Sequence, residues 1–198
     1  MQKLFTYPLY LLMLSTVISC GHKKAPDVKP ESLILSTDST QFFDVQTYLK
    51  GEIKDVTTTP YFIYSITSIN GKRKDSVPIT SAVFEKIAQI FLQKNISDTS
   101  VKKYYRENVF RDLTTKSITM SYSTFNHSLD VQGVDILLNQ ETNLVKYVLI
   151  RSNQNTPDSS VITQLNWKSG QSFLINKSIS KSNGEQISTQ QFVCWNQK

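Results

Sequence analysis

After residue 114, apolar residues recur at every second position of the chain. Ile118, Met120 and Tyr122 alternate with small polar residues, and a period of two predicts a strand with one buried face. Further strand-like runs follow at residues 129–138, 144–151, 161–167, 173–179 and 186–195. Short turns, among them Ser169-Gly170 and Asn183-Gly184, separate several of these runs. Because tight turns join antiparallel neighbours, this half predicts an antiparallel meander of about six strands.

The phase of the alternation slips once inside this half. Leu129 and Val131 hold one phase, and the other phase is held by Val134, Ile136 and Leu138. A slip of one residue at Gln132-Gly133 predicts a β-bulge.

Two segments before residue 114 have apolar residues spaced as on one face of a helix. Apolar residues recur every three or four positions at 40–54, after a cap at Asp38 or Ser39, and at 81–94, after a cap at Thr80 or Ser81. Phe84, Ile87 and Phe91 should cover the sheet, whereas Lys86 and Lys94 should be exposed. A shorter helix is expected after Asp98 or Thr99, with Val101, Tyr104 and Tyr105 turned inward.

A hairpin is expected between the first two helices. Residues 61–69 form a β-rich run, and Asn70-Gly71 follows, which favours a tight turn because both turn positions need positive φ. The returning arm, residues 72–76, is very polar and predicts an edge strand, where charge blocks unwanted pairing.

The N-terminus has the features of a secretory signal. Lys3 precedes an apolar stretch from Leu4 to Val17, which is shorter than the ~20 residues that a membrane-spanning helix needs. Val17, Ile18 and Ser19 then lead into Cys20. This segment resembles the lipobox of bacterial lipoproteins.

The resemblance implies cleavage before Cys20 and acylation of its thiol and new amino group, which together anchor the protein firmly in a membrane. Gly21, in place of the Asp that retains such lipoproteins at the inner membrane, favours the outer membrane. The basic residues His22, Lys23 and Lys24 favour a domain that faces the periplasm.

We therefore divide the chain into a signal peptide (residues 1–19), a lipidated cysteine with a flexible tether (20–38) and a single domain (39–198). The composition is globular, with 39% hydrophobic and 19% charged residues. The predicted fold class is α+β: a curved antiparallel sheet covered by two or three N-terminal helices. An open half-barrel over helices is also the general layout of the periplasmic lipoprotein carriers, so the expected architecture is similar to theirs.

The sequence offers little for catalysis. The two histidines, His22 in the tether and His127 in a polar turn, form no catalytic or zinc-binding pattern. Asp130 and Asp135 are interpreted as solvent-side residues, and Cys194, in an apolar run, as a buried inert thiol. The cluster from Lys102 to Glu107 is interpreted as a solvated helix face, although it could also meet an anionic ligand. We expect no catalytic, cofactor or metal-binding residue, and no nucleic-acid partner.

Two functions fit this description. The first is a non-catalytic binding or envelope-assembly module, anchored in the membrane through Cys20, with an envelope protein as its partner. The alternative is a carrier or sensor of a lipid or other apolar ligand held between sheet and helices. A hydrolase with an unrecognised site is a third and less supported reading. A filled core with an exposed apolar patch would favour the first function, and an apolar cleft the second.

Overall fold

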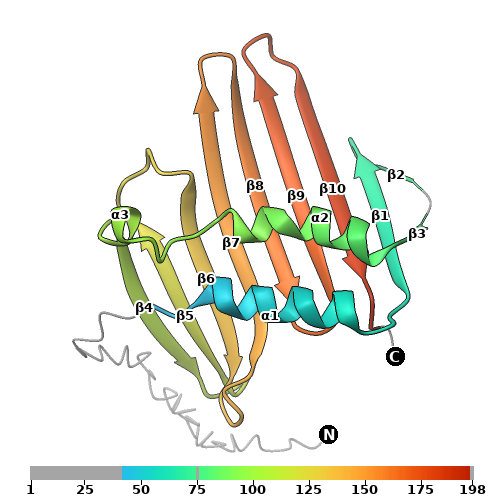
Figure 1. Cartoon of the computed structure of the whole chain (residues 1–198). Coiled ribbons are helices and arrows are strands. Elements are labelled where there is room, and N and C mark those ends of the chain that lie inside the picture. Colours follow the sequence, from blue (N-terminus) through green and yellow to red (C-terminus); the bar gives the residue numbers. More distant parts are fainter. Residues whose placement is uncertain (1–41, 75, 197–198) are drawn as a thin grey trace, which may run out of the picture. The chain divides into compact units, whose positions relative to one another are not determined.

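A computed structural model describes residues 42–74 and 76–196 of the 198-residue chain. The signal peptide, Cys20, the tether and Asp75 lie outside the described residues. The described part is α+β (Figure 1). In chain order its elements are α1 (Val45–Thr58), β1 (Ile63–Ile69), β2 (Lys72–Arg73), β3 (Val77–Ile79), α2 (Ser81–Leu92), α3 (Thr99–Lys102), β4 (Tyr105–Asp112), β5 (Ser117–Thr124), β6 (Val131–Asn139), β7 (Val145–Thr156), β8 (Ser159–Lys168), β9 (Ser172–Lys181) and β10 (Gln186–Cys194).

All ten strands belong to one antiparallel sheet. Their order is β2-β1-β10-β9-β8-β7-β6-β5-β4, and β3 also pairs with β1. The six predicted strands correspond to β5–β10. The prediction of about six strands was too low, because β4 adds to one edge and β1, with β2 and β3, to the other. The pairing of β1 with β10 joins residues more than 100 positions apart, and no local turn in the sequence indicates it.

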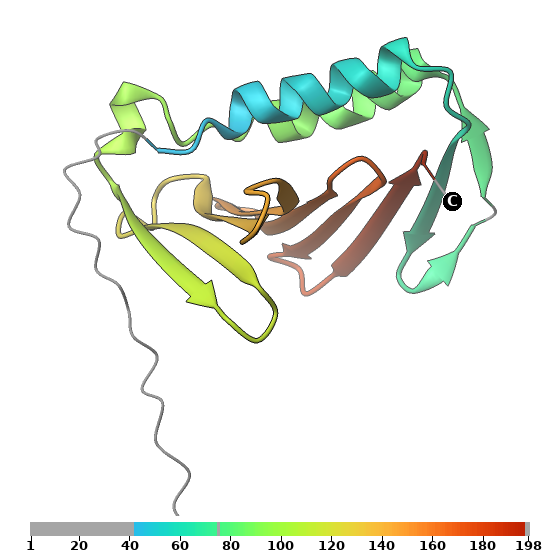
Figure 2. The same cartoon turned by 90° about the horizontal axis from the view of Figure 1, so that it is seen from below.

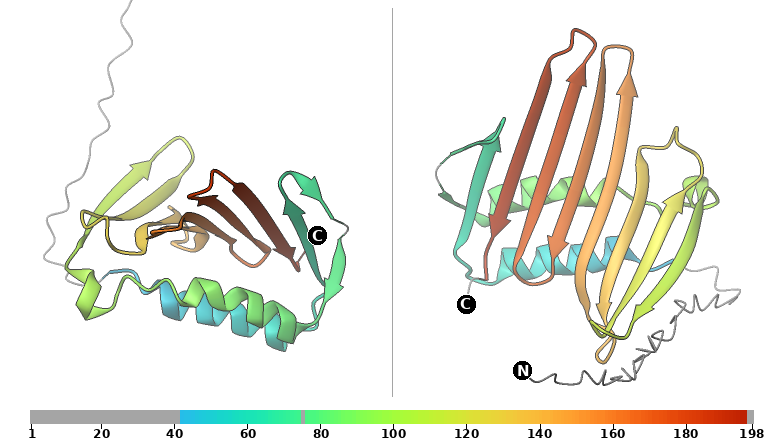
Figure 3. Two further views of the ribbon diagram at one scale, coloured as in Figure 1. Left: turned by 90° about the horizontal axis from the view of Figure 1, so that it is seen from above. Right: turned by 180° about the vertical axis from the view of Figure 1, so that it is seen from behind.

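Helices α1 and α2 lie side by side across one face of the curved sheet (Figures 2 and 3). We call this the helix side and the opposite face the uncovered face. One register row on the helix side crosses five strands and is buried throughout; it consists of Ile136, Val148, Trp167, Phe173 and Val193. From α1, Val45, Leu49, Ile53 and Val56 complete this core.

Two of the three predicted helices are present with changed bounds. The first starts at Val45 and not at residue 40: Asp44 caps it by accepting a hydrogen bond from the backbone N of Thr47 (2.9 Å). Phe42 precedes the helix and packs against the ring of Tyr122 (4.7 Å between centroids). The second helix runs from Ser81 to Leu92 with Thr80 as its cap, as predicted apart from the last two residues.

The predicted helix after Asp98 is wrong beyond its first turn. Only Thr99–Lys102 is helical, and the chain continues as strand β4. In β4, Tyr105, Glu107 and Val109 alternate with Arg106 and Asn108 as they pair with β5. The hydroxyl of Tyr105 donates to the backbone O of Val131 (2.6 Å), so pairing and this bond outweigh the helical spacing of the tyrosines.

Three local predictions are confirmed. Asn70 and Gly71 both have positive φ (48° and 75°) in the turn from β1 to β2. Strand β2 lies at one edge of the sheet. The register between β6 and β7 shifts between Val131 and Gly133, which is the predicted bulge.

Candidate functional site

The space between helices and sheet is filled by aromatic side chains. Phe84 and Phe91 of α2 pack against Trp167, Phe173 and Trp195, with ring centroids 5.1–6.3 Å apart. All five rings are almost completely buried. Phe84 and Phe91 therefore belong to a packed core, as expected of residues that cover the sheet, and the apolar cleft that the carrier alternative needs is not found at these rings.

Strands β9 and β10 run on beyond α2 (Figure 1). A groove lies between α2 and these strands. We call it the α2 groove; its volume is about 500 Å³, and it is lined by Thr67, Lys86, Ile87, Ile90, Ile175, Lys177, Thr189, Gln190 and Gln191. Ile87 and Ile90 come from the helix and Ile175 from the sheet, so both sides contribute apolar surface. Its size lies within the ~300–1,000 Å³ of small-molecule sites.

The apolar surface continues from the groove along the projecting strands. Val161, Ile179 and Ile187 form one register row across β8, β9 and β10. This row lies on the helix side, four residues beyond Ile175 on β9, and its side chains are only partly buried. At ~3.4 Å per strand residue, groove and row together extend for about 14 Å, which suits an elongated apolar group.

Two cations flank this surface. Lys86 on α2 and Lys177 on β9 both line the groove and are exposed. Neither forms an ion pair within residues 42–74 and 76–196. The groove therefore combines isoleucines with positive charge, a combination that fits an anionic amphiphile.

The uncovered face of the sheet is turned toward the viewer in Figure 3, right, and exposed aromatic side chains lie on it. Tyr64 on β1 and Tyr147 on β7 are each 42% exposed, Phe110 on β4 is equally open, and Phe62, just before β1, is 82% exposed. Ile66, Leu149, Leu174 and Phe192 lie on the same face and are partly buried. No helix of the described residues covers this apolar surface, and the polar residues Asn166 and Lys168 of β8 lie between its parts.

Basic residues accompany the aromatic ones on this face. The ammonium of Lys168 lies over the ring of Tyr147 at 6.0 Å, and the guanidinium of Arg106 lies over Phe125 at 5.3 Å. Neither cation has an ion-pair partner among the described residues. Arg151 Nη1 pairs with Asp135 Oδ2 (2.7 Å). The guanidinium also lies over Gly133, where an added Cβ would be 2.6 Å from Arg151 Nη2.

Glu52 of α1 fixes the β8–β9 turn, and sequence reasoning missed this role. Its Oε2 accepts hydrogen bonds from Trp167 Nε1 (3.0 Å) and the backbone N of Gly170 (2.7 Å). The hydroxyl of Tyr48, one turn earlier on α1, bonds to Ser169 Oγ. Burial raises the pKa of Tyr48 to about 12, and the charge of Glu52 acts in the same direction. These contacts hold α1 in place; they do not form a reactive centre.

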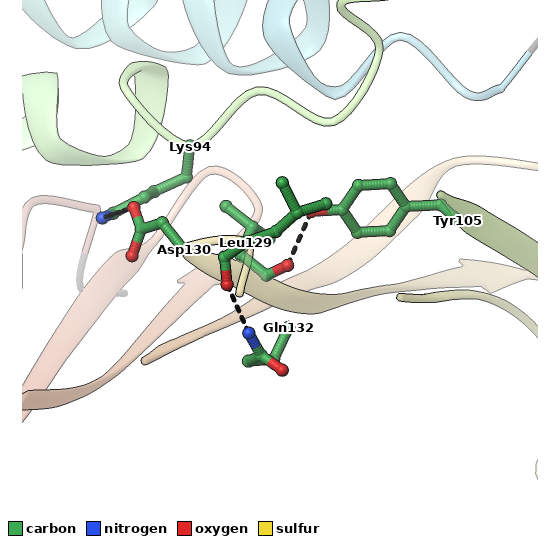
Figure 4. Close-up of polar contacts among 6 residues, drawn as sticks. Lys94, Tyr105, Leu129, Asp130 and Gln132 are labelled. Carbon is green, nitrogen blue, oxygen red and sulfur yellow. Dashed lines mark hydrogen bonds and ion pairs between the residues drawn. The ribbon is translucent and has the colours of Figure 1, made fainter. Parts of the chain in front are cut away.

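Asp130 belongs to a polar cluster at the start of β6 (Figure 4). Its Oδ2 pairs with Lys94 Nζ at 2.5 Å, and the Lys94 side chain is only 10% exposed. Gln132 donates to the backbone O of Leu129. Burial, together with the charge of Asp130, raises the pKa of Tyr105 to about 12. The expectation that Lys94 is exposed is therefore wrong. Asp130 and Asp135 do keep exposed surface, as interpreted, but each carboxylate also pairs with a cation.

The other residues singled out by the sequence do not assemble into a catalytic set. His127 is exposed and lies 3.3 Å from Gln132 Oε1, and Cys194 is buried, as predicted. Lys102 ends α3, whereas Arg106 and Glu107 belong to β4, so the predicted helix face is absent. Glu107 accepts from the hydroxyl of Tyr122 (2.7 Å). No group of three potential metal ligands occurs in residues 42–74 and 76–196.

No family model, curated protein or solved structure matches this chain. None of the helices in the described part combines the length and apolar character that crossing a membrane requires.

Proposed function

We propose that this protein is a non-catalytic binding module, anchored to the outer membrane through acylated Cys20 and facing the periplasm. The observation that carries the proposal is the division of apolar surface between the two faces of the sheet. Packed aromatic rings fill the space between the helices and the sheet, while the uncovered face leaves aromatic side chains exposed. Exposed apolar areas of this kind mark interaction sites.

The proposed partner is an envelope protein whose contact surface is apolar with acidic groups at its margin. Tyr and Phe are enriched where protein surfaces meet. Lys168 and Arg106, which lie over aromatic rings of this face and form no ion pair within the described residues, would meet the acidic groups. Charge complementarity of this kind selects a partner and speeds association.

The docking face can be tested by photo-crosslinking in cells. A photoreactive residue replaces Tyr64, Tyr147 or, as the helix-side control, the exposed Val83 of α2. We expect the same discrete adduct from Tyr64 and Tyr147 and none from Val83. Lys168→Glu should weaken the adduct, and Lys50→Glu on α1 should not. Adducts of equal yield from both faces, or insensitivity to Lys168→Glu, would contradict the proposal.

The anchor has its own test. Cys20→Ser should abolish incorporation of a fatty-acid analogue, because attachment depends on acyl chains and not on a spanning helix. Equal labelling of the wild type and the variant would show that the lipobox interpretation is wrong, without affecting the docking face.

The α2 groove supports a second candidate function, a carrier or sensor of an anionic amphiphile. Its isoleucines would contact the acyl chain, and Lys86 and Lys177 would meet the headgroup. The probe is a photoreactive fatty acid added to the purified full chain, with capture followed by mass spectrometry. Ile90→Asp in the groove should reduce capture, whereas Val83→Asp on the same helix should not. Equal capture by both variants would exclude the groove.

A further inference from the structure

Among the described residues, strand β4 forms one edge of the sheet and pairs with β5 alone (Figure 1). Its eight residues contain no proline or glycine, and its register with β5 runs from end to end without a shift. An exposed edge strand of this length is a template for a further strand. Strand β2, at the other edge, has only two residues, and both are basic.

The pairing with β5 decides which backbone groups of β4 face the open edge. The backbone N of Phe125 donates to the O of Tyr104 (3.2 Å), one position before the β4–β5 register begins. Because hydrogen-bonded pairs alternate along antiparallel strands, the even-numbered residues of β4 bond to β5, and the odd-numbered residues direct N–H and C=O outward. No turn or loop backbone group in the described ranges bonds to these outward groups.

The charges of β4 are arranged so that the strand complements a second copy of itself. With a two-fold axis at Val109, antiparallel pairing brings odd-numbered residues opposite each other, so that their outward groups can bond across the axis. Glu107 then lies opposite Arg111 of the second copy, and Arg106 lies opposite Asp112 of the second copy. Symmetry repeats both pairs, and opposite charges at facing positions stabilise a strand pair.

Neighbouring registers lose this match. An axis at Asn108 would place Glu107 opposite Val109 of the second copy, and an axis at Phe110 would place it opposite Leu113. Each shift also separates Arg106 from Asp112. An axis between two residues would set outward groups against inward ones, so the backbone excludes it.

The side chains at this edge are available for the match. Glu107 and Arg111 are exposed, and Arg111 has no ion-pair partner in the part of the chain that the structure describes. Phe110, 43% exposed, would lie diagonally across the axis from its own copy, within reach of an aromatic ring. Pairing would therefore also cover apolar surface.

We infer that β4 pairs antiparallel with β4 of a second copy about a two-fold axis at Val109, so that one sheet continues through both copies. The contact uses the edge of the sheet and leaves Tyr64 and Tyr147 on the uncovered face, and the α2 groove, open. It therefore depends on neither proposal above.

Disulfide crosslinking of the full chain, in membranes of cells that produce it, tests the axis. In the inferred register the Cα atoms of the two copies of Val109 lie about 5.5 Å apart, which a disulfide can bridge. Those of Asn108 lie about 8 Å apart, beyond the ~7 Å limit. We expect a reducible dimer from Val109→Cys but not from Asn108→Cys. The wild type controls for the native cysteines, of which Cys194 is buried.

Charge reversal in the Val109→Cys background gives a second test. Arg111→Glu sets like charges opposite each other twice and should weaken pairing by about tenfold, equivalent to ~1.4 kcal/mol. Glu107→Arg should do the same. Coexpression of these two variants with different tags restores opposite charges across the axis and should restore a dimer between them. Arg73→Glu, on β2 at the other edge, should leave the yield unchanged.

Three outcomes would overturn the inference. The first is equal crosslinking from Val109→Cys and Asn108→Cys, or none from either, which would mean that the charges of β4 only block pairing. The second is a mixed pair that crosslinks no better than each charge variant alone. The third is a reducible adduct of Val109→Cys with a different protein, which would show that another chain occupies this edge.

Discussion

The described residues form four ion pairs, and Lys94, which pairs with Asp130, is the least exposed of the four cations. Asp130 itself is 37% exposed, so water screens part of the interaction. Its Oδ1 has no other partner, and loss of Lys94 would leave the whole carboxylate without one. The pair therefore stabilises the junction between the end of α2 and the start of β6.

We predict that Lys94→Ala lowers the free energy of unfolding by about 1 kcal/mol, because the Asp130 carboxylate loses its cation but stays partly hydrated. Lys86→Ala, on the exposed side of α2, should change it by no more than about 0.5 kcal/mol. Urea denaturation of both variants measures the difference. Equal midpoints would show that the pair adds nothing to stability.

At the scale of elements, Glu52 links helix α1 to the β8–β9 turn. Glu52→Ala removes the acceptor for Trp167 Nε1 and the backbone N of Gly170. We expect a loss of about 1–3 kcal/mol, because the indole N–H stays buried without a partner. Glu52→Gln keeps an acceptor oxygen and should cost less. If thermal unfolding ranks the two variants the other way, the charge matters more than the acceptor.

Elements with a local signal were predictable, and those decided by distant partners were not. Helix α2, its cap at Thr80, the Asn70-Gly71 turn and the bulge at Gln132-Gly133 depend on neighbouring residues, so periodicity and turn chemistry indicate them. Strand β4 resembled a helix because Val101, Tyr104 and Tyr105 have helical spacing, yet pairing with β5 decides its structure. Lys94 and Asp130 are 36 residues apart, and neither surface could be located before the sheet order was known.

For the whole molecule, partly buried tyrosines predict instability in alkali. Burial raises the pKa of Tyr48 and of Tyr105 from the ordinary 10.0 to about 12 in the folded state. The folded protein keeps these protons after the unfolded chain has lost them. This contribution to stability is thus complete below pH 10 and is lost as the pH rises from about 10 to about 12.

Circular dichroism and the ultraviolet absorbance of tyrosinate, followed together during a base titration, check this expectation. Unfolding should coincide with ionisation of the buried tyrosines. Full ionisation near pH 10 without loss of structure would contradict the burial of Tyr48 and Tyr105.

Packed rings fill the space between the helices and the sheet, so we expect binding on outer surfaces. Urea denaturation of Phe84→Ala and Phe91→Ala measures how much this packing stabilises the fold, with the exposed Val83→Ala as control. Each phenylalanine variant should lose ~3–5 kcal/mol, because truncating a packed ring leaves a cavity, and the control should change by no more than about 0.5 kcal/mol. Unchanged midpoints for both phenylalanine variants would contradict the account and show that these rings line a ligand cleft.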